Sequence, residues 1–80
     1  MKVKEITTNR NKNYLIGIKE TEHHVMAYIL QKRLIGYKKL HNYKTLKTLI
    51  PDYDYITLCA ICDYERKLEN KNKLVQWSLN

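Results

Sequence analysis

The chain is short of several residue types that particular chemistries require. Its 80 residues include two glycines, one proline, two cysteines and no phenylalanine. Two glycines are too few for the usual phosphate-cradling loops, and no Walker, dinucleotide-binding or nucleophile-elbow motif occurs. Ser78 is the only serine in the sequence. We therefore expect no enzyme and no cofactor, with a small basic ribonuclease as the one enzymatic alternative, since such a site needs few side chains around a phosphate.

Long apolar runs are missing as well. No stretch approaches the roughly 18 apolar residues of a membrane-spanning helix. The N-terminal segment, residues 1–6, lacks the apolar core of a signal peptide. A chain of this length suits one small domain without a large enclosed cavity. We expect a single domain over 1–80, located in the cytoplasm, with no membrane as a partner.

Acidic residues are absent from the middle of the chain. The sequence has 15 Lys plus Arg against 8 Asp plus Glu, which gives a net charge of +7. From His23 to Pro51 there is no carboxylate, and cations alternate with tyrosines. Such a block attracts polyanions, and aromatic rings beside cations can stack on unpaired bases. The plainer alternative is a basic face kept for solubility, with the tyrosines in the core.

The N-terminal segment predicts an antiparallel hairpin. Residues 3–8 are β-prone, an Asn-rich loop follows over 9–13, and Tyr14, Ile16 and Ile18 fall on one face of a second strand. A glycine in that strand, at position 17, indicates a bulge or a close approach by another element.

The next segment is ambiguous between helix and strand. Thr21 suits the N-cap of a helix over 21–35, with a glycine after it as the stop, and this helix is the favoured prediction. Its apolar residues nevertheless point nearly all round a helix. The alternative is therefore a pair of strands, 24–30 and 34–40, that turn at 31–33.

Helical spacing predicts two further helices. Apolar residues recur mostly every three positions over 37–50, and Pro51 would end that helix. Asp52 and Asp54 complement the start of a third helix, which 70–72 would terminate. The side of this helix expected to pack comprises Leu58, Ile61, Cys62, Glu65 and Leu68.

Alternation over 74–79 predicts a C-terminal strand that turns Val75, Trp77 and Leu79 to the core. The expected fold class is therefore α+β. It would be a small single domain of two or three helices packed on a short antiparallel sheet, formed by the N-terminal hairpin and the C-terminal strand.

Two motifs invite a metal or redox interpretation. Cys59 and Cys62 form a C-x-x-C, but zinc needs two more ligands and the histidines form no second ligand pair. Apolar neighbours favour two buried, reduced cysteines. The side chains of the adjacent His23 and His24 diverge, so a helix start on the surface is the expected place for them. We predict no metal site and no catalytic residue.

Residues 34–38 resemble the tight glycine-containing turn of a helix-turn-helix, which would aim a helix over 39–50 at a groove. A ribbon-helix-helix with 14–18 as its strand is also allowed. Either arrangement predicts binding to nucleic acid.

The sequence predicts a small basic nucleic-acid-binding protein, regulatory and of phage, plasmid or viral type. Heavy use of Lys, Ile, Asn and Tyr is typical of a low-GC genome. The partner would be DNA or RNA, with cations on phosphates and the tyrosines and asparagine at bases or sugar edges. The predicted binding residues are Lys32, Arg33, Tyr37, Lys38, Lys39, Asn42, Tyr43, Lys44 and Lys47.

The alternative function is a phage-encoded inhibitor of a host defence or replication enzyme, of the anti-CRISPR kind. It would use the same basic face against an acidic protein surface, or it would block a nucleic-acid channel. A homodimer is compatible with both functions.

Overall fold

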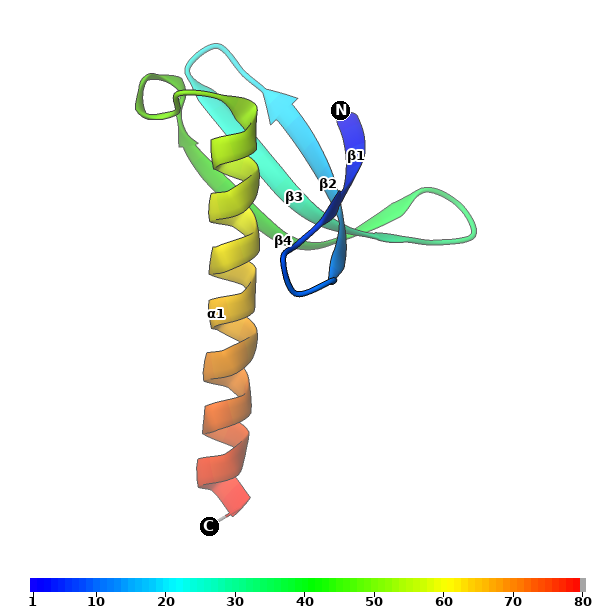
Figure 1. Ribbon diagram of the computed structural model, residues 1–80, viewed down its shortest axis with the longest axis vertical. Coiled ribbons are helices and arrows are strands. Elements are labelled where there is room, and N and C mark those ends of the chain that lie inside the picture. Colours follow the sequence, from blue (N-terminus) through cyan, green and yellow to red (C-terminus); the bar gives the residue numbers. More distant parts are fainter. Residues whose placement is uncertain (80) are drawn as a thin grey trace.

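A four-stranded antiparallel sheet and one long α-helix make up the computed structural model (Figure 1), which describes the backbone of residues 1–79 and the side chains of 1–72. The sheet order is β1-β2-β3-β4, so each strand pairs with its neighbours in sequence. The α+β class is confirmed, but the described residues form one α-helix rather than two or three. The elements are β1 (Lys2–Thr7), β2 (Asn13–Glu20), β3 (His24–Lys32), β4 (Tyr37–Leu46), the 3-10 helix η1 (Lys47–Leu49) and α1 (Tyr53–Leu79).

The predicted N-terminal hairpin is confirmed as β1 and β2. In its loop the Thr8 N–H donates to the Lys12 carbonyl at 2.8 Å. Asn11 has a φ of 59°, a left-handed conformation that asparagine adopts more readily than most residues. The face of β2 that carries Ile16 packs under the helix, as its alternation predicts.

Gly17 marks a close approach, one of the two possibilities that its position indicates. A Cβ on this residue would lie 2.6 Å from Met1 Sδ and 3.0 Å from Leu30 Cδ1. These side chains pack on the sheet face that α1 does not cover. We call this side the open face of the sheet.

The helix predicted over 21–35 is wrong, because this segment forms β3. Val25 and Ala27 are buried beneath the helix, whereas Tyr28 and Leu30 are buried on the open face. A strand buried on both faces reads as a continuous apolar run, which has no helical stripe and no alternation. The alternative pair of strands is therefore the correct one.

The signals that favoured that helix serve turns instead. The His24 N–H donates to Thr21 Oγ1 at 3.2 Å, so the predicted cap stabilises the β2–β3 turn and the histidines flank the start of a strand. Gly36 has a φ of 71° in the turn between β3 and β4. This turn spans 33–36 rather than the predicted 31–33.

The helix predicted over 37–50 is also wrong, because β4 and η1 occupy it. His41 and Tyr43 alternate toward the helix, with a register shift where Ile29 and Leu30 pair with β4. The spacing of three among the leucines of this segment is coincidental. Both the helix-turn-helix and the ribbon-helix-helix are excluded with it, since their helices are strands here.

The start of α1 is as predicted. After Pro51, Asp52 accepts a hydrogen bond from the Tyr55 N–H at 2.8 Å and so caps the helix. Of the side expected to pack, Ile61 is buried, whereas Leu58 is 59% exposed and Leu68 is 43% exposed.

The end of α1 differs from the prediction. The helix continues through 70–72 to Leu79, so the terminator and the C-terminal strand are both wrong. No glycine or proline follows Pro51, and lysine, glutamate and leucine in this stretch are good helix formers. The side chains of Val75, Trp77 and Leu79 lie outside the described residues.

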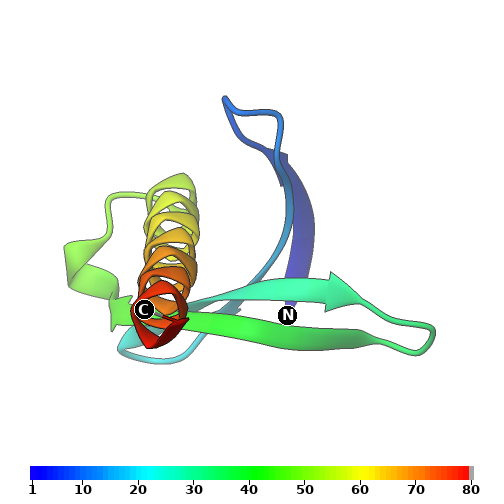
Figure 2. The same ribbon diagram turned by 90° about the horizontal axis from the view of Figure 1, so that it is seen from below.

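The core lies between α1 and the sheet. Figure 2 shows that the sheet is strongly bent, with α1 in the corner between the β1–β2 and β3–β4 hairpins. The buried core residues are Ile16, Val25, Ala27, Ile29, Ile56, Ala60 and Ile61.

None of the described helices combines the length and the apolar character needed to cross a membrane.

Candidate nucleic-acid interface

The distal half of the β3–β4 hairpin projects from the rest of the protein as a two-stranded ribbon (Figure 2). Every residue from 31 to 40 is exposed, and we call these residues the hairpin arm. Strand pairing continues to Lys32 and Tyr37, and the Arg33 N–H donates to the Gly36 carbonyl at 3.1 Å. The arm is therefore a paired ribbon up to its tip rather than an irregular loop.

The cations of this hairpin lack carboxylate partners among the described residues. Among the described residues, no carboxylate forms an ion pair with any of five cations on it. Its own sequence contains no acid, and the arm extends away from the acidic residues of α1. The five unpaired cations are Lys32, Arg33, Lys38, Lys39 and Lys44.

The cations of the β1–β2 hairpin are arranged differently. Lys4 Nζ lies 3.0 Å from Asp54 Oδ1 of α1. Near the hairpin loop, Lys12 Nζ and Arg10 Nη1 lie 3.8 and 4.0 Å from Glu65 Oε2. Carboxylates of the helix therefore pair with three of the five cations of this hairpin, whereas Lys2 and Lys19 form no ion pair with a described carboxylate. None of the five cations of the β3–β4 hairpin forms such a pair.

Strand register places most of the predicted binding residues on one side of β3 and β4. Lys39 lies on the open face, with its Nζ 4.3 Å from the centre of the Tyr28 ring in a cation–π contact. Asn42 and Lys44 also lie on the open face, because each of them pairs with a residue of β3 whose side chain lies on that face. Lys38 faces the opposite way, and Arg33 lies in the turn.

Two predicted binding residues lie apart from this group. Tyr43 packs against the core, and burial first, then the nearby Cys59, raises the pKa of its phenol above 10.0. Lys47 Nζ lies 3.8 Å from Glu20 Oε1, so a carboxylate partly balances its charge. The open face thus holds five of the nine predicted residues, Arg33 and Lys38 lie elsewhere on the same hairpin, and these two lie on the body of the protein.

A buried histidine and a half-buried aspartate form a polar pair between the sheet and the helix, which the sequence pattern did not predict. His41 Nε2 lies 2.7 Å from Asp63 Oδ2, and the His41 ring packs against Tyr64 at 5.7 Å between centres. Tyr64 in turn meets Tyr14 edge-on at 6.4 Å. The pair is 22 residues apart, so no local spacing signals it. Its place beneath α1 gives it a structural role, holding the helix on β4.

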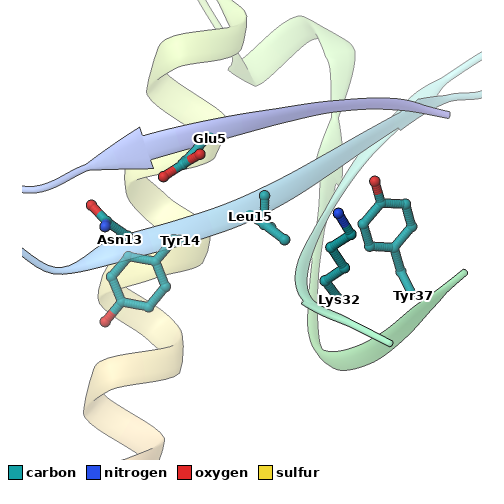
Figure 3. Close-up of a pocket in the computed structure, with 6 residues that line it drawn as sticks. All are labelled: Glu5, Asn13, Tyr14, Leu15, Lys32 and Tyr37. Carbon is teal, nitrogen blue, oxygen red and sulfur yellow. The ribbon is translucent and has the colours of Figure 1, made fainter. Parts of the chain in front are cut away.

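A pocket of about 300 Å³ lies at the base of the arm (Figure 3). Lys32 and Tyr37 extend into it from β3 and β4, and Leu15 of β2 lies beside them. Glu5 of β1 places a carboxylate on its opposite side. The carboxylate of Glu5 would repel an anion bound by Lys32. We therefore do not assign this pocket as a phosphate site.

The C-x-x-C motif is not a buried pair. Cys59 is half-buried next to Tyr43, but Cys62 is exposed, which corrects the expectation that both are buried. Both are free thiols on α1. Over the described residues, no group of three His, Cys, Asp or Glu is placed to hold a metal ion.

Comparisons of the chain with protein-family models, with curated proteins and with solved structures give no match.

Proposed function

We propose that this protein binds nucleic acid through the hairpin arm and the open face of β4 next to it. The observation that carries the proposal is the projecting ribbon whose five cations have no partner among the described carboxylates. A cation without an internal partner keeps its full attraction for phosphate. The functional surface is thus a ribbon of β-strands, not the helix that the sequence pattern suggested.

The dimensions of the arm suit a groove of nucleic acid. Two paired strands lie about 4.8 Å apart, and two-stranded ribbons of this kind bind in the major or the minor groove of DNA. Cations on both strands and on both sides of the ribbon would meet phosphates along the two walls of the groove. Asn42, which is exposed on the open face, offers an amide to sugar or base edges.

Such binding must depend on salt. Each phosphate that a lysine or arginine neutralises releases condensed counterions, so five contacts give a slope of about −4.5 for log K against log salt on duplex DNA. A protein that binds through this surface would act by occupying its target. That mode of action suits a small regulatory protein of a phage, plasmid or virus in the host cytoplasm.

The test uses fluorescence anisotropy with labelled duplex DNA, single-stranded DNA and RNA at two salt concentrations. Lys38→Glu with Lys39→Glu reverses two charges on the arm. The matched control is Lys67→Glu with Lys71→Glu, which makes the same change on exposed positions of α1. We expect affinity to fall by more than about tenfold for the arm variant, and much less for the control, since two phosphate contacts are lost from the arm alone.

Equal losses in the two variants would show that net charge, and not the arm, attracts the ligand. If no nucleic acid binds the wild-type protein at low salt, the proposal fails. The same basic face would then point to the inhibitor alternative, in which one acidic protein partner binds with fixed stoichiometry.

A further inference from the structure

The tip of the hairpin arm carries two large aliphatic side chains in full contact with solvent. Leu34 is completely exposed and Ile35 is 91% exposed. They are the two most exposed large apolar residues among those described, and they lie at the end of the ribbon that projects away from α1. Neither contributes to the core, so folding does not explain them.

Turn chemistry does not explain these two residues either. Tight hairpin turns favour Gly, Asn, Asp and Ser, which tolerate the turn conformation or hydrogen-bond to its backbone. Here only Gly36 follows that preference, with its φ of 71°. A polar pair at 34 and 35 would suit this turn and its solvent exposure better. The aliphatic pair therefore indicates a partner that covers it.

The chemistry around the tip restricts what that partner is. Arg33 and Lys32 precede the apolar pair, and Lys38 follows it across the turn, with no acid anywhere on the hairpin. The partner must offer an apolar slot bordered by dense negative charge. A base step of a duplex, seen from the groove between two phosphate backbones, has this composition.

We infer that Leu34 and Ile35 form a wedge that enters a base step of duplex DNA from the minor groove and kinks it. This inference rests on the proposed function and names its substrate as the duplex. Aliphatic side chains are used in this way by proteins that bend DNA, where partial unstacking is offset by the larger protein surface that the bent duplex contacts. The flanking Arg33, Lys32 and Lys38 would bind phosphates on either side of the opened step.

An anionic membrane surface is the other partner with this chemistry, but the arm favours the duplex. A lipid surface would meet only the tip. Here the cations continue behind the tip along the open face from Lys39 to Lys44, a stretch of about 17 Å at 3.3 Å per residue. A row of this length follows a phosphate backbone rather than a single plane.

The experiment removes the wedge while retaining every charge. Leu34→Asn with Ile35→Ser introduces residues that turns favour, so the variant should fold at least as well as the wild type. Leu49→Asn is the matched control, because Leu49 is 65% exposed on η1, away from the arm. Duplexes carry 2-aminopurine at successive steps to report unstacking and end labels to report bending by energy transfer.

We expect the wild type and the Leu49→Asn control to raise 2-aminopurine emission at a step and to shorten the end-to-end distance. The tip variant should lose both signals and about tenfold in duplex affinity, while its binding keeps the same salt slope. Loss of the signals with an unchanged salt slope would separate the wedge from the phosphate contacts.

Three results would overturn the wedge. Salt-dependent binding of the wild type with no unstacking or bending would remove it and leave the proposed function intact. Signals that persist in the tip variant would do the same. Capture of the wild type, but not of the tip variant, by phosphatidylserine-containing vesicles, with no duplex binding at low salt, would reject both the wedge and the proposed function.

Discussion

The two hairpins of this protein share a topology but differ in what surrounds their charges. In β1–β2, cations pair with α1, as between Lys4 and Asp54, and the inward face packs beneath the helix. In β3–β4, the half near α1 supplies the core, whereas residues 31–40 extend past it and stay exposed. Because the helix supplies both apolar cover and carboxylates, the strand segments beyond its reach lose both. The position of each hairpin relative to α1 thus determines whether it is a structural part of the fold or a projecting basic ribbon.

The largest effect expected from this comparison is on stability. Ile16, in the structural hairpin, is fully buried, so Ile16→Ala should lower the free energy of unfolding by about 2–5 kcal/mol. Leu34→Ala, at the tip of the arm, should change it by less than about 0.5 kcal/mol. Urea unfolding followed by circular dichroism measures both values, and similar losses would show that the arm is part of the cooperative core.

The pair of His41 and Asp63 that holds α1 on β4 should contribute the next largest effect. Asp63→Ala removes the partner of His41 Nε2 and leaves a buried polar ring unsatisfied, which costs about 1–3 kcal/mol. A double-mutant cycle with His41→Ala isolates the coupling between the two residues. If the two single changes were simply additive, the pair would not link the helix to the sheet.

Alkaline pH should weaken the anchored part of the fold. Burial first, then the charge of Glu65, raises the pKa of Tyr14 above 10.0, and burial and Cys59 do the same for Tyr43. The unfolded chain therefore releases these protons at lower pH than the folded chain does. The stability they contribute is present below about pH 10 and is lost as the pH rises through the raised folded pKa.

Unfolding experiments from neutral to strongly alkaline pH test this. Tyr14→Phe should make the loss of stability less steep above about pH 10, because one titrating phenol is removed. An unchanged steepness for Tyr14→Phe would contradict the role assigned to burial.

The smallest effect concerns the surface ion pairs that distinguish the hairpins. Lys4→Gln should cost about 0.2–1 kcal/mol at low salt and almost nothing at high salt, since its pair with Asp54 is exposed. Lys38→Gln should leave stability nearly unchanged and weaken nucleic-acid binding instead. The reverse pattern, with Lys38 needed for stability, would remove the contrast between paired and unpaired cations.

Local signals explain which elements the sequence could predict. The Asn-rich loop over 9–13 and the Pro51–Asp52 boundary act within a few residues, so the first hairpin and the start of α1 are as predicted. The central strands were misassigned because β3 is buried on both faces and shows no period. The helix end was misplaced because 70–72 lack the glycine or proline that stops a helix.

The candidate site was predictable in composition but not in shape. An acid-free block is a property of sequence alone, and the hairpin formed by β3 and β4 lies within it. Whether Tyr43 and Lys47 join the arm depends on Cys59 and Glu20, distant residues that only the fold brings near. The pair of His41 and Asp63 is likewise a product of tertiary structure.

The central claim is that the projecting hairpin, and not the one balanced by α1, binds nucleic acid. Nitrogen-15 correlation spectra of the labelled protein, recorded with an unlabelled duplex at low salt, map the contact surface residue by residue. We predict shifts concentrated in residues 31–40 and at Asn42 and Lys44, with the amides of β1 and of α1 unmoved. Shifts centred on β1, β2 or α1, or no shifts at all, would contradict the claim.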